Sequence, residues 1–116
     1  MQWQQLNSID QLNDLVSKSF DEPVLIFKHS TRCSISSMAL DRLERAWNPA
    51  EMEGLSAWYL DLIAHRDISN KIAELFKVEH QSPQVLLIKN GETSYHTSHM
   101  GINYGQVKEA LGKVLS

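Results

Sequence analysis

The sequence contains a single cysteine, Cys33, which lies in a cluster of small polar residues. A thiol that can ionise is suited to attack a disulfide, because the thiolate is the nucleophile in thiol–disulfide exchange. A lone cysteine can also be a small buried apolar residue. The polar neighbours favour the reactive alternative, and they are Ser30, Thr31, Arg32, Ser34 and Ser36.

The segments on either side of Cys33 place it where a strand turns into a helix. Residues 24–27 are a short apolar run directly after a proline, which predicts a buried central strand. Apolar residues then recur at helical spacing over residues 38–47. The unpaired N–H groups at the start of that helix favour the thiolate of Cys33, and Arg32 adds a positive charge.

Three other polar residues could contribute to the chemistry at Cys33. Ser36 stands where a dithiol oxidoreductase carries its second cysteine, so its hydroxyl can hydrogen-bond to the Cys33 sulfur but cannot resolve a mixed disulfide. His29 could tune the thiolate, or it could bond to the backbone at a strand end. Asp61 could transfer protons, although a structural role in a nearby loop is favoured.

Helix and strand patterns alternate along the chain. They predict helices over residues 8–16, 38–47, 68–76 and 107–114, and strands over residues 24–27, 55–62, 85–88 and 92–98. Strands separated by helices are expected to pair in parallel, and Asn90-Gly91 predicts one antiparallel hairpin. The order α-β-α-β-α-β-β-α is typical of one thioredoxin-like α/β domain over residues 1–116, with helices on both faces of a mixed four-stranded sheet.

The predicted buried strand, which spans residues 84–88 when Gln84 is included, is directly preceded by Gln81, Ser82 and Pro83. A thioredoxin-like architecture places a cis-proline there, beside the active cysteine, and we therefore predict a cis bond between Ser82 and Pro83. That bond would turn polar groups of Gln81 and Ser82 toward the sulfur, where an extended thiol substrate can pair with them.

Composition and charge exclude several other classes of function. A formal net charge of −3 and scattered basic residues argue against nucleic acid as a partner. No apolar run approaches membrane-spanning length, and the N-terminus lacks the features of a secretory signal, so we expect a cytoplasmic protein with no membrane partner. The spacing of His80, His96 and His99 fits no compact set of metal ligands, and we expect no metal site.

Four ordered blocks of the sequence resemble the monothiol bacilliredoxin family, which are general stress proteins with a thioredoxin fold. The resemblance covers nearly the whole chain. Three positions depart from the family pattern: Ser34 replaces a common proline, Gln81 a usual glutamate, and Met100-Gly101 a usual Trp-Asp pair. The blocks are residues 29–36, Asp61-Leu62 with residues 66–70, residues 80–84 and residues 96–99.

The resemblance implies a monothiol thiol–disulfide oxidoreductase with Cys33 as its redox cysteine. Arg32, Ser34 and Ser36 would lie beside the sulfur, and the segment around Pro83 would face it as the substrate loop. The implied reaction removes bacillithiol, or a similar low-molecular-weight thiol, from S-thiolated client proteins. Bacillithiol is then a co-substrate, no prosthetic group is needed, and a second thiol or a partner reductase regenerates Cys33.

Two other functions remain open from the sequence. A monothiol glutaredoxin with a similar site can carry an iron–sulfur cluster between two chains, although the glycine-phenylalanine pair typical of those proteins is absent here. Alternatively, the chain could be a non-catalytic thioredoxin-like interaction module in which the Pro83 loop binds a peptide strand.

Overall fold

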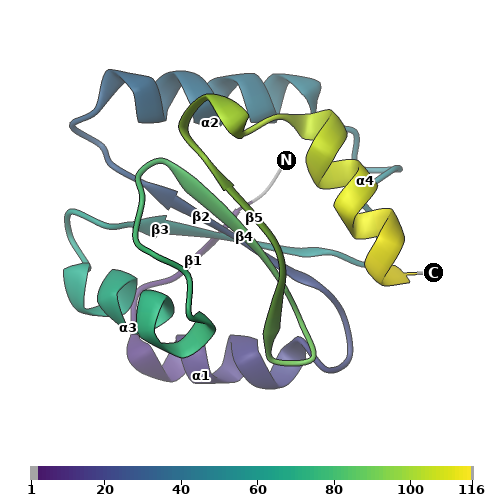
Figure 1. Cartoon of the computed structure of the whole chain (residues 1–116), viewed down its shortest axis with the longest axis horizontal. Coiled ribbons are helices and arrows are strands. Elements are labelled where there is room, and N and C mark those ends of the chain that lie inside the picture. Colours follow the sequence, from purple (N-terminus) through teal and green to yellow (C-terminus); the bar gives the residue numbers. More distant parts are fainter. Residues whose placement is uncertain (1–2, 116) are drawn as a thin grey trace.

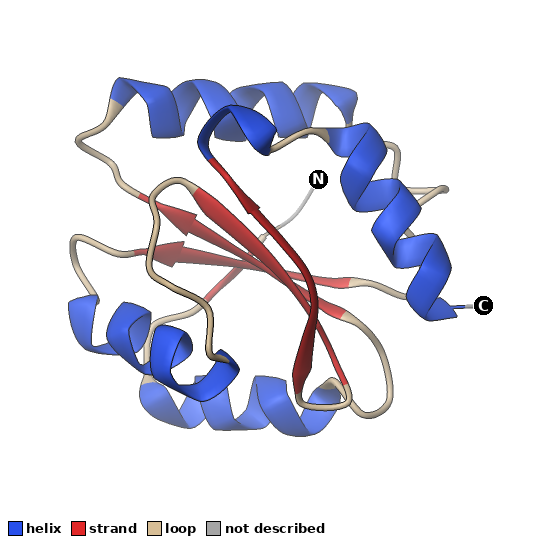
Figure 2. Ribbon diagram, viewed as in Figure 1, coloured by secondary structure: helices blue, strands red, loops and turns tan. Residues whose placement is uncertain are grey.

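A twisted sheet of five strands forms the centre of the computed structural model, which describes residues 3–115 (Figures 1 and 2). The strands lie in the order β1-β3-β2-β4-β5. Their bounds are β1 Gln4–Gln5, β2 Val24–His29, β3 Ser56–Asp61, β4 Gln84–Lys89 and β5 Glu92–Ser98. The helices are α1 Ile9–Lys18, α2 Ser34–Ala46, α3 Arg66–Phe76, the short 3-10 helix η1 His99–Gly101, and α4 Tyr104–Leu115.

Two helices cover each face of the sheet (Figure 2). Leu12 of α1 and Ile72 of α3 share one buried cluster with Ile26 of β2, whereas Leu43 of α2 and Leu111 of α4 share the other with Phe27. Successive side chains of a strand point to opposite faces. The strand β2 therefore sends Lys28 toward the layer of α1 and α3, and His29 toward the layer of α2 and α4.

The sheet differs from the sequence prediction in two respects. The two-residue strand β1 pairs in parallel with β3 and adds a fifth strand, which was too short and too polar to give a strand pattern. The strand β4 pairs antiparallel with β2, so the expectation of parallel pairing was wrong at this position. The reason is the connection at residues 77–83, which leads the chain from the end of α3 back along the sheet before β4 begins (Figure 1).

This reversal brings three loops to one end of the sheet. The strand β2 runs toward that end and is followed by the loop that leads to α2 (Figure 1). The strand β4 begins at the same end, because Lys28 near the end of β2 pairs with Gln84 at the start of β4. The start of α3 follows the end of β3, which is parallel to β2. Residues 30–33, residues 62–65 and the last part of the 77–83 connection, next to β4, therefore lie at the same end of the sheet.

Candidate functional site

Cys33 is the N-cap residue of α2, in an extended backbone conformation. Its N–H donates to the Ser30 carbonyl oxygen over 3.2 Å, and its carbonyl oxygen accepts from the Ser37 N–H over 3.1 Å. The Cys33 residue is half-buried and its thiol is free. Its side chain caps none of the N–H groups of the first helical turn. The thiol therefore lies at the positive end of a thirteen-residue helix, as the sequence predicted.

The Ser36 hydroxyl lies in a buried hydrogen-bonded group on the other side of the first turn. Its oxygen accepts from the Ser30 N–H over 3.1 Å and lies 2.7 Å from Nδ1 of His29. The Ser36 oxygen is the acceptor in its bond with the Ser30 N–H, so the hydrogen of the Ser36 hydroxyl is available to donate to Nδ1 of His29. Among the described residues Ser36 makes these two bonds and none to the Cys33 sulfur, so it holds the start of α2 against the end of β2.

His29 is almost fully buried between the sheet and α2. Its ring lies 5.5 Å from that of Tyr59 and 6.2 Å from that of Phe27, measured between ring centroids. Burial lowers the pKa of His29 below 6.5, and the negative charges of Asp61 and Glu44 oppose that effect. A neutral imidazole is thus favoured, which suits an Nδ1 that accepts the Ser36 hydrogen.

The predicted substrate loop lies at the same end of the sheet as Cys33. The Ser82–Pro83 peptide bond is cis. Pro83 is buried, Gln81 and Ser82 are half-buried, and the Pro83 carbonyl oxygen accepts from the His99 N–H over 3.0 Å. The Ser82 hydroxyl oxygen is shielded from solvent and has no hydrogen-bond partner within residues 3–115. His99 begins η1 directly after β5, with a φ of 53°, whereas His96 lies within β5.

The remaining predicted residues, Arg32, Ser34 and Asp61, form no hydrogen bond with the Cys33 thiol among the described residues. Arg32 and Ser34 are exposed on either side of Cys33. Asp61 accepts from the Ile63 and Ala64 N–H groups over 3.1 and 3.3 Å, which is the structural role in a loop that the sequence favoured.

Sequence reasoning missed a polar cluster on the other face of the sheet. Lys28 is fully buried, and its Nζ lies 3.2 Å from the Ser69 carbonyl oxygen and 3.4 Å from Nδ1 of His80. Burial lowers the pKa of Lys28 to about 8. The alternation of side chains along a strand could have revealed this cluster. Lys28 lies two residues after Ile26 in the same strand, so both side chains point to the same buried face.

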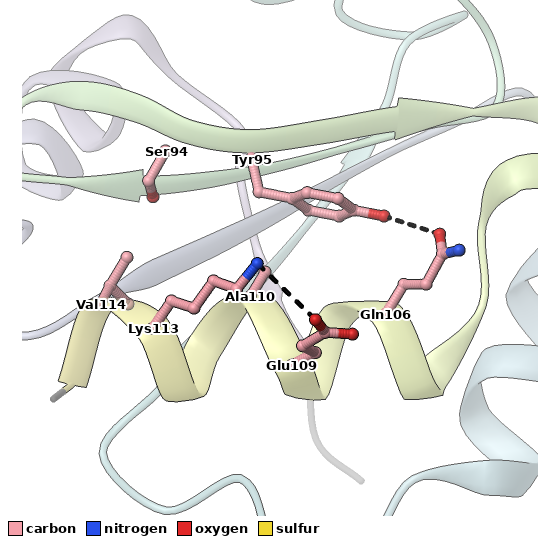
Figure 3. Close-up of a pocket in the computed structure, with 7 residues that line it drawn as sticks. All are labelled: Ser94, Tyr95, Gln106, Glu109, Ala110, Lys113 and Val114. Atoms are coloured by element: carbon pink, nitrogen blue, oxygen red, sulfur yellow. Dashed lines mark hydrogen bonds and ion pairs between the residues drawn. The ribbon is translucent and has the colours of Figure 1, made fainter.

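Cys33 lines neither of two hollows on the described surface. One of about 350 Å³ lies between β5 and α4, and its polar side chains already have partners (Figure 3). Tyr95 donates to Gln106 over 3.2 Å, and Glu109 pairs with Lys113. A smaller one of about 70 Å³ lies between α2 and η1, beside the first turn of α2.

Two further observations concern metal binding and membranes. In the part of the chain that the structure describes, no three His, Cys, Asp or Glu side chains gather as a set of metal donors. None of the helices in residues 3–115 is both long enough and apolar enough to cross a membrane.

Comparison with known proteins agrees with this geometry. A structure described as an oxidoreductase with a thioredoxin fold matches with a TM-score of 0.78 and 32% identity, over 91% of this chain and 90% of the other. The thioredoxin of Trypanosoma brucei brucei matches with a TM-score of 0.75 and 17% identity, over 98% and 91%. Thioredoxin Mala s 13 of Malassezia sympodialis matches with a TM-score of 0.75 and 16% identity, over 97% and 90%.

The last two matches are distant in sequence and show the fold, which is that of thioredoxin. The family model for monothiol bacilliredoxin BrxC matches residues 4–107, a span that contains Cys33, the substrate loop and the buried Lys28 cluster. A half-buried single thiol at a helix start is the site such a thiol oxidoreductase requires. The chain therefore belongs to the monothiol bacilliredoxin family.

Proposed function

We propose that the protein removes bacillithiol from protein mixed disulfides by thiol–disulfide exchange at Cys33. The observation that carries this proposal is the place of Cys33, which is the N-cap of α2 and the only cysteine of the chain. The thiolate is the nucleophile of the exchange, and partial exposure gives a disulfide access to the sulfur. Without a second thiol, the chain can form a mixed disulfide but cannot resolve it internally.

The reaction consists of two balanced exchanges. In the first, the Cys33 thiolate attacks the bacillithiol sulfur of the client's mixed disulfide. A Cys33–bacillithiol disulfide forms, the old disulfide breaks, and the client leaves as a thiolate. In the second, another thiolate attacks the bacillithiol sulfur on Cys33, which releases the Cys33 thiolate and a new disulfide. That second thiol is free bacillithiol or a partner reductase, and no prosthetic group takes part.

The neighbouring residues have separate roles in this proposal. The buried bonds among Ser36, His29 and Ser30 hold the first turn of α2, so that Cys33 keeps its place at the helix end. Arg32 and Ser34 flank the sulfur on the exposed side and contact the incoming disulfide. Gln81, Ser82 and Pro83 form the opposite wall of the substrate site. Exchange of this kind requires a pool of reduced thiols, which the cytoplasm maintains, and we place the protein there.

The test uses a model client protein that carries bacillithiol on one cysteine. Wild-type protein should release the client thiol and gain the mass of one bacillithiol on Cys33, as measured by mass spectrometry of the intact proteins. Cys33→Ser should do neither, while Ser37→Ala, an exposed serine of the same helix, should behave as wild type. Equal client release by Cys33→Ser would refute the role of this thiol. A faster reaction with glutathione mixed disulfides would assign the activity to another small thiol.

A further inference from the structure

We propose that Arg66 and His80, with the buried ammonium of Lys28 behind them, form a subsite for the carboxylate groups of the small thiol. This inference rests on the proposed function, because it concerns the substrate of the same cysteine. Arg66 is the first residue of α3, and His80 lies three residues before Pro83. Both lie at the end of the sheet that carries residues 30–33 and the substrate loop.

The first step of the argument is the uncompensated charge of Lys28. Its side chain is fully buried, yet none of the described carboxylates lies within ion-pair distance of Nζ. Its partners are the Ser69 carbonyl oxygen and Nδ1 of His80, both uncharged acceptors. A buried cation without an anion is destabilising, because no opposite charge replaces the hydration that it loses, and it calls for a role outside packing.

The second step concerns His80, which contacts Lys28 and is itself exposed. An ammonium can only donate hydrogen bonds, so Nδ1 of His80 must accept, and the Ser69 hydroxyl lies 3.3 Å from the same nitrogen. The ring hydrogen is therefore on Nε2. Burial and the positive charges of Lys28 and Arg66 lower the pKa of His80, which keeps the ring neutral with this tautomer. His80 is exposed, and Nε2–H has no partner among residues 3–115.

The third step is the guanidinium of Arg66. Arg66 is exposed and forms no ion pair within the described chain. It lies one helical turn before Ser69, whose hydroxyl is 3.3 Å from Nδ1 of His80, so the first turn of α3 lies against His80. The acids nearest in sequence, Asp67 and Glu79, are exposed and pair with neither Arg66 nor His80. A guanidinium and an N–H donor in front of a buried ammonium match a carboxylate, which accepts hydrogen bonds and carries the opposite charge.

The experiment compares three small disulfides of similar size: dithiodipropionate, which is anionic, bis-hydroxyethyl disulfide, which is neutral, and cystamine, which is cationic. The rate of mixed-disulfide formation on Cys33 is measured at pH 7 and low salt by quenched mass spectrometry. For wild type, Arg66→Gln and His80→Phe, the rate with the anionic disulfide is divided by the rate with the neutral disulfide. This quotient is the anionic-to-neutral ratio. Lys77→Gln is the control, because this exposed lysine follows the far end of α3.

We expect Arg66→Gln to lower the anionic-to-neutral ratio by roughly threefold to fivefold, the size expected of one exposed charge interaction. His80→Phe removes a neutral N–H donor to the carboxylate and should lower the ratio by a similar factor. Lys77→Gln should leave the ratio at the wild-type value, and high salt should reduce the wild-type ratio. Unchanged ratios in both site variants would overturn the subsite while leaving the reaction of Cys33 intact.

A failure of Cys33 to react with any of the three disulfides would instead refute the proposed function. In that case a binding experiment tests the subsite: the NMR signals of the His80 ring are followed while dithiodipropionate is added. A shift that appears in wild type and is lost in Arg66→Gln supports it, and the absence of a shift in wild type overturns it.

Discussion

The burial of Lys28 gives the free energy of unfolding a dependence on pH that can be worked out from the structure. The pKa of Lys28 falls from 10.5 to about 8 in the fold. Between these two values the unfolded chain binds more protons at Lys28 than the folded chain does, so stability rises with pH across this window. Above pH 10.5 the amine is neutral in both states and its burial costs no charge.

Below pH 8 Lys28 is charged in the folded protein, and the full free-energy cost of burying this charge lowers the stability. A tenfold change in proton affinity corresponds to about 1.4 kcal/mol, so the change in pKa from 10.5 to about 8 amounts to about 3 kcal/mol. Replacement of Lys28 by methionine, which has a similar length and no charge, removes this penalty. We expect Lys28→Met to gain stability relative to wild type at pH 7 and to lose most of that gain, about 2.5 kcal/mol, at pH 10.

Urea unfolding at pH 7 and pH 10, followed by tryptophan fluorescence, measures this difference. Tyr59 and Tyr104 also titrate in alkaline solution, and the fold raises the pKa of both, but these effects are common to wild type and variant and cancel in the comparison. Lys77→Met, at an exposed lysine, should show no such difference between the two pH values. An equal stability difference between wild type and Lys28→Met at both pH values would refute the reasoning.

Three further predictions concern the start of α2 and His29, the residue at the end of β2 that it contacts. Ser36→Ala removes the partner of the buried Ser30 N–H and of His29, and we expect urea unfolding to show a loss of about 1–3 kcal/mol, against little change for Ser37→Ala. Ser34→Pro places a proline at the first helical position, and the free energy of unfolding should rise by about 0.5–1 kcal/mol; a lower melting temperature would contradict this. Because burial lowers the pKa of His29 below 6.5, the unfolded chain takes up this proton first, and stability should fall as the pH drops below 6.5 toward the folded pKa. NMR titration of the His29 ring checks this, and a value at or above 6.5 would count against it.

Local patterns were sufficient to predict the surroundings of Cys33. A buried strand and an amphipathic helix are each recognisable from a few residues, and their junction places the cysteine at a helix start without knowledge of the rest of the fold. The Asn90-Gly91 turn is also local, and the predicted hairpin between β4 and β5 is present. Contacts over longer distances in the sequence were not accessible in this way, which explains the missed direction of β4 and the missed strand β1.

The sequence by itself determined that the chain has one thiol, that this thiol starts a helix, and that a loop ending at Pro83 precedes a buried strand. Only the tertiary structure decided which partners the polar side chains have. Ser36 turns to His29 instead of the sulfur, and Lys28 meets His80 across 52 residues of sequence. Periodicity reports which face of an element is buried, but it carries no information on which distant side chain lies opposite, because that depends on strand order and on the path of the connections between strands.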